Sequence, residues 1–367
     1  MGKTYEVLPS HAQHGKHQLL RKYLPAWAKV LSRSKTPPEK LVYVDGFAYK
    51  GRYDSSETGD AGVPGSPLVA IECLRGAEGT TTPVVVTIEQ KAEYYADLKR
   101  VLETLGPDER GKVDVRPPIH GAFADHIHRI MDRAKHYGAP TFVFIDPFGP
   151  SGFPIETVRT ILDTPRSEVL INLMWVLTAL SMTKADTQHH FTEMFGDESW
   201  RSVMSCPVED RGAAYLQAYM NRLRSRSGAA AKIVRSLEVR SYEGNIVYWL
   251  VFCTNSEKGW QEMKRAMWQV APSDGARFHD TTVFGQDVLF QDSPDLQQLR
   301  RQLLEHFKGR LAVRFDEVER FVLLETAFDH TSHLNKRVLV PLEAEGIISV
   351  IRPEGGRGMK GATINFP

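Results

Sequence analysis

The feature that most constrains the fold is an alternation of short apolar runs and amphipathic segments between residues 41 and 180. The apolar runs indicate strands, and the segments between them carry apolar residues at helical spacing. The clearest runs are "LVYVD", "PVVVTIEQ", "TFVFIDPFG" and "EVLINLMWV". A helix is expected before them, over 15–32. This alternation predicts an α/β fold with a mostly parallel sheet that is covered on both faces.

The composition is that of an ordinary globular protein, with 367 residues, 42% hydrophobic residues and a formal net charge of +1. The charge gives no chain-wide field for nucleic acid, so any basic surface must be local. The N-terminal residues lack a secretory pattern and no apolar run is long enough to span a bilayer, which predicts a cytoplasmic protein without membrane contact. Cys73, Cys206 and Cys253 are too scattered for a disulfide framework or a zinc knuckle.

The chain is expected to form two domains, 1–290 and 291–367. Within the first, residues 183–228 turn polar and helical, as in an insertion or cap. The second domain shows helical segments at 295–307, 315–328 and 331–345, followed by the short strands "IISVIRP" and "ATINF" with the basic tip "EGGRGMKG" between them. This order is that of a winged helix-turn-helix.

Acids end the predicted strands of the first domain. In "LVYVDGFAYKGRYD", Asp45 closes a strand and small residues follow it, while Glu89 closes the next strand. Ligands of open α/β sheets bind at this edge, where an acid commonly holds a ribose diol, although a simple tight turn explains the pattern about as well. Because no G-x-G-x-x-G is present, a nicotinamide cofactor is disfavoured and S-adenosylmethionine fits better.

The fourth predicted strand ends in Asp146, Pro147 and Phe148. This turn resembles the D-P-P-[YF] loop of amino-group methyltransferases, in which the acid orients a planar amine and the aromatic ring stacks on a base. The second proline of that loop is missing here. The alternative is a Pro-Gly turn with a helix-capping acid.

Most of the chain resembles the three-Cys-motif partner proteins of bacteria and phages. The similar blocks are "GKHQLLRKYLPAW", "VYVDGFAYKGRYD", "GSPLVAIE", "FVFIDPFGPSG", "VYWLVFCTNSEKGWQEMKRAMW" and the C-terminal winged helix. The resemblance implies a methyltransferase-like Rossmann domain, a C-terminal helix-turn-helix and association with a separate three-cysteine protein that is similar to radical S-adenosylmethionine enzymes.

The resemblance also implies a cofactor loop. The family has F-A-G-x-G after the acid, and Tyr49 stands here in place of its first glycine, where its side chain is expected to crowd the cofactor. His17 matches another family block and is assigned to the cofactor pocket rather than to a metal, since His11, His14 and His17 have no partner at a metal-ligand spacing. The residues assigned to the cofactor are His17, Asp45, Gly46, Phe47, Ala48, Gly51 and Glu89.

In the predicted winged helix, Thr331 caps the third helix and leucine and valine side chains form its buried face. That periodicity leaves His333, Lys336 and Arg337 outward, and Arg352, Arg357 and Lys360 on the wing. Cations on both elements suit nucleic-acid phosphates, although winged helices also bind proteins. The residues assigned to nucleic acid are Lys336, Arg337, Arg357 and Lys360.

Two functions follow from these patterns. The first is an S-adenosylmethionine-dependent methyltransferase that acts on a nucleic acid or nucleotide-like amine, and the acids at Asp45, Glu89 and Asp146 favour it. The second is a non-catalytic binding subunit with a degenerate Rossmann core, which the departure at Tyr49 favours. Both are expected to work with the three-cysteine partner.

Overall fold

The computed structural model describes residues 11–53, 62–240, 244–272, 275, 277–279, 294–354, 356 and 358–367. The chain divides into two compact units. The first, called here the sheet unit, comprises Met1–Glu262 and Phe278–Phe284, and the second, the C-terminal unit, comprises Met263–Arg277 and Gly285–Pro367. In the described ranges, no helix is both long and apolar enough to cross a bilayer.

The sheet unit is built on one large sheet in which neighbouring strands follow the order β9-β10-β8-β7-β1-β4-β5, with β6 also paired to β4. At the end of this order β11 (Arg277–His279) neighbours β9, and a small pair, β2 and β3, lies outside the large sheet. The strands are β1 (Lys40–Asp45), β2 (Arg52–Tyr53), β3 (Val63–Pro64), β4 (Thr82–Glu89), β5 (Asp114–Val115), β6 (Ile119–His120), β7 (Thr141–Ile145), β8 (Ser167–Met174), β9 (Ile233–Arg240) and β10 (Ile246–Thr254).

Most pairs in this sheet are parallel. β1 pairs in parallel with β4 and β7, and β7 pairs in parallel with β8, whereas β10 runs antiparallel to both β8 and β9. All five residues of β7 are buried, as are seven of the eight residues of β8. Strands buried on both faces are typical of parallel sheets, and they explain why these runs are continuously apolar.

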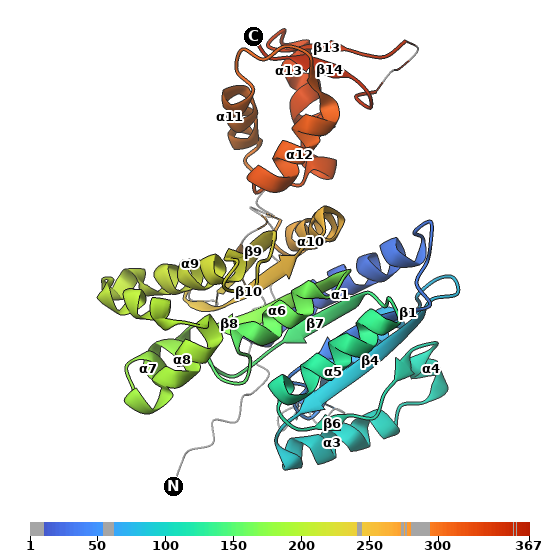
Figure 1. Ribbon diagram of the computed structural model, residues 1–367. Helices are drawn as coiled ribbons and strands as arrows, with labels where there is room; N and C mark the ends of the chain where they lie inside the picture. The colour runs from blue at the N-terminus through green and yellow to red at the C-terminus, as the bar shows by residue number, and fades with distance from the viewer. Residues whose placement is uncertain are drawn as a thin grey trace, which may run out of the picture. The chain divides into compact units, whose positions relative to one another are not determined.

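Helices cover both faces of the sheet (Figure 1). On one face, α5 and α6 bury Ile127 and Val158 against Val44 and Val143 of the central strands. On the other face, α1 packs Tyr23 against Phe142 of β7, with ring centres 5.3 Å apart. The helices outside the insertion are α1 (His11–Ser32), α2 (Ser66–Leu74), α3 (Ala92–Glu103), α4 (Pro107–Arg110), α5 (Phe123–His136), α6 (Ile155–Asp163) and the start of α10 (Glu257–Val270), which belongs to the C-terminal unit from Met263 on.

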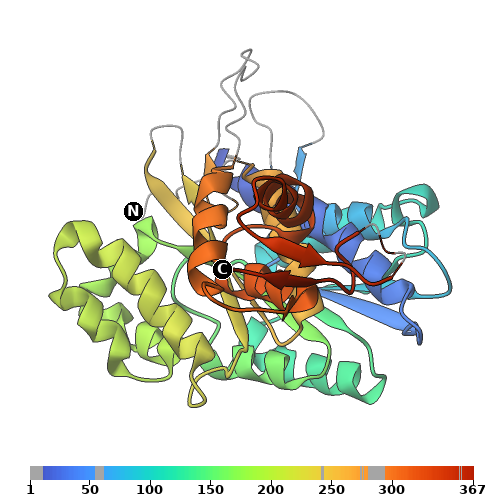
Figure 2. The same cartoon turned by 90° about the horizontal axis from the view of Figure 1, so that it is seen from above.

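The chain between β8 and β9 is helical and gathers at one side of the sheet unit, coloured yellow-green in Figures 1 and 2. An aromatic cluster holds it together, in which Phe191 packs on Trp200 and Phe195 packs on Tyr215 and Tyr219. Its elements are α7 (Val176–Met182), η1 (Ala185–Thr187), α8 (Gln188–Phe195), η2 (Glu198–Ser205), η3 (Val208–Asp210) and α9 (Arg211–Arg224).

The C-terminal unit contains helices and a sheet of order β12-β14-β13, around a core of leucine, valine and phenylalanine side chains. Its elements follow the predicted sequence of helices and strands, and its assignment as a winged helix stays a prediction. They are α11 (Leu296–His306), β12 (Val313–Arg314), α12 (Phe315–Glu325), the π-helix η4 (His330–Leu339), α13 (Val340–Ala344), β13 (Ser349–Ile351) and β14 (Thr363–Asn365).

The orientation predicted for His333 is wrong. Its side chain is buried, its Nδ1 accepts the backbone N–H of Asp329 at 3.1 Å, and its ring centre is 4.4 Å from that of Trp268. The reason is that η4 is a π-helix, whose wider turns change the angular spacing of side chains that a 3.6-residue period assumes. Burial lowers the pKa of His333 to about 4, against the attraction of Asp329, so the ring adds no positive charge at neutral pH.

Candidate active site

Three acidic side chains stand at the carboxyl ends of neighbouring parallel strands. Asp45 is the last residue of β1, Glu89 is the last residue of β4, and Asp146 directly follows β7. Since β1 lies between β4 and β7, the three acids share one edge of the sheet. Ligands of open α/β sheets bind outside this edge.

Asp45 is completely buried beneath the loop that follows β1. Its carboxylate accepts hydrogen bonds from the Tyr43 hydroxyl at 3.1 Å and from the Phe47 backbone N–H at 3.4 Å. Burial raises the pKa of Asp45 to about 7. A hydrogen bond from Ser66 acts in the opposite direction and lowers this pKa, whereas the negative charge of Asp146 raises it further. Asp45 therefore exchanges a proton near neutral pH at this edge.

Glu89 ties the loop after β1 to the loop after β4. Its Oε2 accepts the backbone N–H of Tyr49 at 2.9 Å, and its Oε1 accepts the backbone N–H of Lys91 at 2.8 Å. Each carboxylate oxygen has two lone pairs, so each oxygen retains capacity for a ligand hydroxyl. Glu89 thus has an evident structural role and the chemistry needed to hold a diol.

Tyr49 adopts a backbone conformation that ordinarily belongs to glycine, with a φ of +52°. Its ring packs edge-on against Tyr94, with centres 4.5 Å apart, and lies 5.7 Å from Tyr53 and 6.3 Å from Phe148. A left-handed conformation costs a non-glycine residue about 1–3 kcal/mol, which these ring contacts offset in part. The loop therefore keeps a glycine-like course although it carries a large side chain.

The small residues of this loop have packing reasons of their own. A Cβ atom on Gly46 would lie 2.6 Å from the ring of Phe123 in α5, and Phe47 packs on the same ring with centres 5.6 Å apart. Gly51 has a φ of +77°, and Ala48 is buried. Helix packing and turn geometry account for these four loop residues, so their contacts with a cofactor stay a prediction.

Asp146 is paired inside the protein. The Lys16 ammonium of α1 forms an ion pair with Oδ2, and the Asn172 amide of β8 donates to Oδ1 at 2.5 Å. Burial is the largest effect on the pKa of Lys16 and lowers it, but the charge of Asp146, the hydrogen bond to it and the charges of Tyr53 and Asp45 together leave that pKa raised. Both oxygens of Asp146 therefore already have a donor inside the protein, and a substrate amine has to share them with Lys16 and Asn172.

Lys16 and Asn172 were missed as site residues in the sequence. Lys16 stands in the "GKH" block at the start of an apolar helix, and Asn172 is the amide in the otherwise apolar run "LINLMWV". A polar side chain in a strand buried on both faces needs a partner, which is the signal that could have pointed to Asn172.

His17 and Phe148 lie close to these acids. His17 is buried, with its ring centre 6.1 Å from that of Tyr53. Phe148 is 52% exposed beside Asp146, and Pro147 between them is buried. An exposed aromatic ring next to a carboxylate offers the face that stacking on a planar base requires. Within the described ranges, no group of three or more His, Cys, Asp and Glu side chains is arranged to hold a metal ion.

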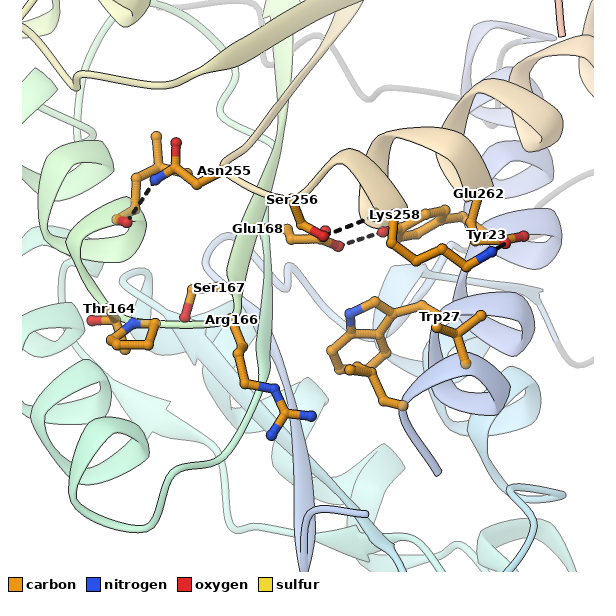
Figure 3. A pocket seen from close by; sticks show the side chains of 15 residues that line it. Tyr23, Trp27, Thr164, Arg166, Ser167, Glu168, Asn255, Ser256, Lys258 and Glu262 are labelled. Carbon is orange, nitrogen blue, oxygen red and sulfur yellow. Dashed lines mark hydrogen bonds and ion pairs between the residues drawn. The ribbon is translucent and has the colours of Figure 1, made fainter. Parts of the chain in front are cut away.

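A cavity of about 420 Å3 lies at the opposite, amino-terminal edge of β8, between α1 and the start of α10 (Figure 3). Glu168 and Glu262 are its buried acids. Glu168 accepts hydrogen bonds from the Tyr23 hydroxyl and from the Thr254 hydroxyl, the latter at 3.0 Å. Burial raises the pKa of Glu168 to about 7, against these two hydrogen bonds. No sequence pattern pointed to this cavity.

Glu168 is expected to make stability depend on pH. The pKa of Glu168 is 4.5 in the unfolded chain and about 7 in the folded protein, so between these pH values the folded state binds an extra proton. The stability that protonated Glu168 contributes is therefore full at acid pH and is lost as pH rises to about 7. Glu168→Gln should match the wild type at pH 5 and be about 2 kcal/mol more stable at pH 8. Urea unfolding at both pH values measures this, and equal differences at the two pH values would contradict it.

The cations predicted to contact nucleic acid lie in the C-terminal unit. Lys336 and Arg337 on η4 are exposed, as is Lys360 before β14, whereas Arg357 lies outside the described residues. Arg352, which was expected on the wing, pairs through its guanidinium with Glu343, with 2.7 Å between Nη1 and Oε1. The sequence could not show this pair, since Glu343 sits on the preceding helix.

No family model and no curated protein matches this chain. Among solved structures, a candidate rRNA-methylase of Clostridium thermocellum is 12% identical, with 66% of this chain and 95% of that chain covered and a TM-score of 0.31. Fibrillarin of Aeropyrum pernix, with natively bound S-adenosyl-L-methionine, is 10% identical, with 65% and 76% covered and a TM-score of 0.25. A candidate methyltransferase of Porphyromonas gingivalis W83 is 11% identical, with a TM-score of 0.27. The match covers 63% of this chain, which spans only 40% of the length of that methyltransferase.

These likenesses are too distant to carry an argument about function. The fold class rests on the chain's own strand order, in which a mostly parallel sheet carries one strand, β10, that lies between β8 and β9 and runs antiparallel to both. The sheet unit therefore has a mixed α/β fold with a mostly parallel central sheet, and its Rossmann-like methyltransferase type stays a prediction. Membership of the three-Cys-motif partner family stays a prediction.

Proposed function

We propose that the sheet unit is an S-adenosylmethionine-dependent methyltransferase that acts on a nucleic acid or nucleotide-like amine. The observation that carries the proposal is the convergence of Asp45, Glu89 and Asp146 at the edge of the sheet where open α/β folds bind ligands. S-adenosylmethionine supplies a methyl group on a positively charged sulfur. An acidic edge favours such a cationic ligand.

The residues at this edge fit the cofactor and an amine. Glu89 retains lone pairs for ribose hydroxyls on a carboxylate that two backbone N–H groups hold in place. Asp146 accepts hydrogen bonds from an acceptor amine beside its ion pair with Lys16, and the exposed ring of Phe148 stacks on the acceptor's planar base.

Glu89→Ala is expected to weaken binding of S-adenosylmethionine and S-adenosylhomocysteine by about 1.5–3 kcal/mol, because hydrogen bonds to a charged group are lost. Calorimetric titration with both ligands measures the change, and Glu93→Ala, which removes an exposed carboxylate from α3, is the matched control. Thermal melting of each variant shows whether the loops that Glu89 holds are intact. Failure of the wild type to bind either ligand would remove the methyltransferase proposal, and unchanged binding by a folded Glu89→Ala would remove the ribose assignment.

A second candidate function is a non-catalytic binding subunit. The pairing of both Asp146 oxygens with Lys16 and Asn172 favours it, because the carboxylate is already satisfied inside the protein. In either case we propose a three-Cys-motif partner that is similar to radical S-adenosylmethionine enzymes. Methyl transfer to RNA or DNA by the complex supports the first function, whereas cofactor binding without transfer supports the second.

We also propose that the C-terminal unit is a winged helix that contacts nucleic acid through its exposed cations. Full-length protein with Lys336→Gln, Arg337→Gln and Lys360→Gln should bind duplex DNA more weakly, and its salt slope should fall by about 0.9 for each phosphate that the variant no longer neutralises. A gel-shift series over salt concentration measures both effects. An unchanged slope would favour a protein-binding module instead, which loss of the three-cysteine partner in a pull-down would show.

A further inference from the structure

The sheet unit carries a second hollow, a crevice of about 520 Å3 that is distinct from the acidic edge. It lies between the second half of α5, the first residues of β1 and β4, and the segment that joins β5 to β6. Its floor is aliphatic, formed by Val42, Val84 and Val86 of the sheet with Ile119 and Ile130 beside them. Several of these side chains stay partly exposed, so the crevice interrupts the packing of α5 on the sheet.

The charged residues of this crevice are cations. Lys40, Arg116, Arg129 and Arg133 line it, and no acidic side chain of the described ranges does. Arg116 pairs with Asp114 at 2.7 Å, but among the residues that the structure describes no carboxylate pairs with the other three. The crevice therefore has an uncompensated positive field over an apolar floor.

Helix stabilisation explains only part of this charge. Arg133 stands in the last turn of α5, where a cation favours the helix dipole. Lys40 begins β1 and Arg116 follows β5, so neither belongs to that helix. Cations from three separate elements converge on one hollow, which a local effect in α5 does not account for.

An exposed aromatic ring stands at the rim. Tyr137 is 57% exposed, and the Lys40 ammonium and the Arg133 guanidinium lie 5.9 Å and 5.8 Å from its ring centre. Single-stranded nucleic acids bind where aromatic rings stack on bases and nearby cations meet phosphates. Arginine is suited to phosphate because its planar guanidinium donates two parallel hydrogen bonds.

We propose that this crevice binds a nucleotide unit, with its base against the aliphatic floor and Tyr137, and its phosphate at Arg129 and Arg133. The volume is more than an inorganic phosphate needs and lies in the range of sites for organic ligands. A fatty acid would use the floor but needs one cation for its carboxylate, not cations from several sides. The unit belongs either to a free nucleotide or to a single strand, and the assignment does not depend on the acidic edge.

The test uses the full chain with Lys336→Gln, Arg337→Gln and Lys360→Gln, so that those cations do not contribute. Adenosine 5′-monophosphate is titrated by calorimetry, and a short fluorescein-labelled oligouridylate is titrated by anisotropy. The double variant Arg129→Gln with Arg133→Gln should weaken binding by at least about tenfold for whichever of the two probes the unsubstituted crevice binds. The reason is that two charged hydrogen-bond donors to phosphate are removed. Lys22→Gln with Lys35→Gln removes two exposed cations elsewhere and should change binding by less than about twofold.

The outcomes separate the alternatives. Crevice-dependent binding of the monophosphate alone identifies a free nucleotide, and crevice-dependent binding of the oligonucleotide, weakened further by Tyr137→Ala, identifies a single strand. Equal affinities for the crevice variant and its control overturn the proposal, as does a wild-type crevice that binds neither probe. If dodecanoate binds in a crevice-dependent way and the nucleotides do not, the occupant is an amphipathic acid and the nucleotide assignment is wrong.

Discussion

Lys16→Met is expected to lower the free energy of unfolding by about 3–5 kcal/mol at neutral pH, the range for removing one partner of a buried ion pair. The side chains of Lys16 and Asp146 are only 6% and 11% exposed, so water cannot replace the lost ammonium. Methionine nearly matches lysine in length, and little of the loss should therefore come from packing. The Asn172 amide remains as a hydrogen-bond donor but brings no charge.

Urea unfolding at neutral pH measures this loss, and Lys16→Met with Asp146→Asn is the matched double variant. The double variant should recover most of the loss, since it leaves no unpaired charge. A loss below about 1 kcal/mol in Lys16→Met, as for an exposed pair, would show that the pair does not hold α1 to β7.

Much of the architecture could be predicted from the sequence because strand and helix periodicity is a local signal. The runs ending in Asp45 and Glu89 form the expected strands, and parallel pairing then places their acids at one edge without further information. The contacts that decide their chemistry are not local. Lys16 reaches Asp146 across 130 positions of the chain, and the sequence shows the charges but not the distance between them.

Local rules also failed where the backbone departs from standard geometry. The outward position expected for His333 assumed an α-helical period, which the π-helix η4 does not follow. At Tyr49 the backbone keeps the left-handed conformation of a glycine, with a φ of +52°, although the residue has changed. The sequence revealed the substitution there, whereas the ring contacts with Tyr94 and Phe148 needed the fold.

Lys264→Met is expected to destabilise the C-terminal unit by about 4 kcal/mol. The Lys264 ammonium is buried and donates to the carbonyl oxygens of Val322, Leu323 and Thr326 at 2.7, 2.9 and 2.8 Å. The last carbonyls of a helix have no partner within it, and these oxygens lie at the end of α12. The variant removes three hydrogen bonds from a charged donor, although Val322 keeps a hydrogen bond from the Thr326 hydroxyl at 2.8 Å. Hydrogen bonds to charged groups contribute about 1.5–3 kcal/mol each, which makes the summed loss a large fraction of a small domain's stability.

Hydrogen exchange measured by mass spectrometry locates this effect. The amides of α12 should lose protection in Lys264→Met while those of β7 and β8 keep it, because the lost bonds lie within the C-terminal unit. Lys258→Met is the matched control. It removes an exposed lysine from the first turn of α10, the helix that also carries Lys264, and this lysine pairs with Glu262 one turn further on. Lys258 and Glu262 both lie in the sheet unit, so the loss of their pair should be felt there and should leave α12 protected. If the two variants lose protection equally, α12 depends on the integrity of α10 as a whole. It would then not depend on the Lys264 ammonium at the carboxyl end of α12.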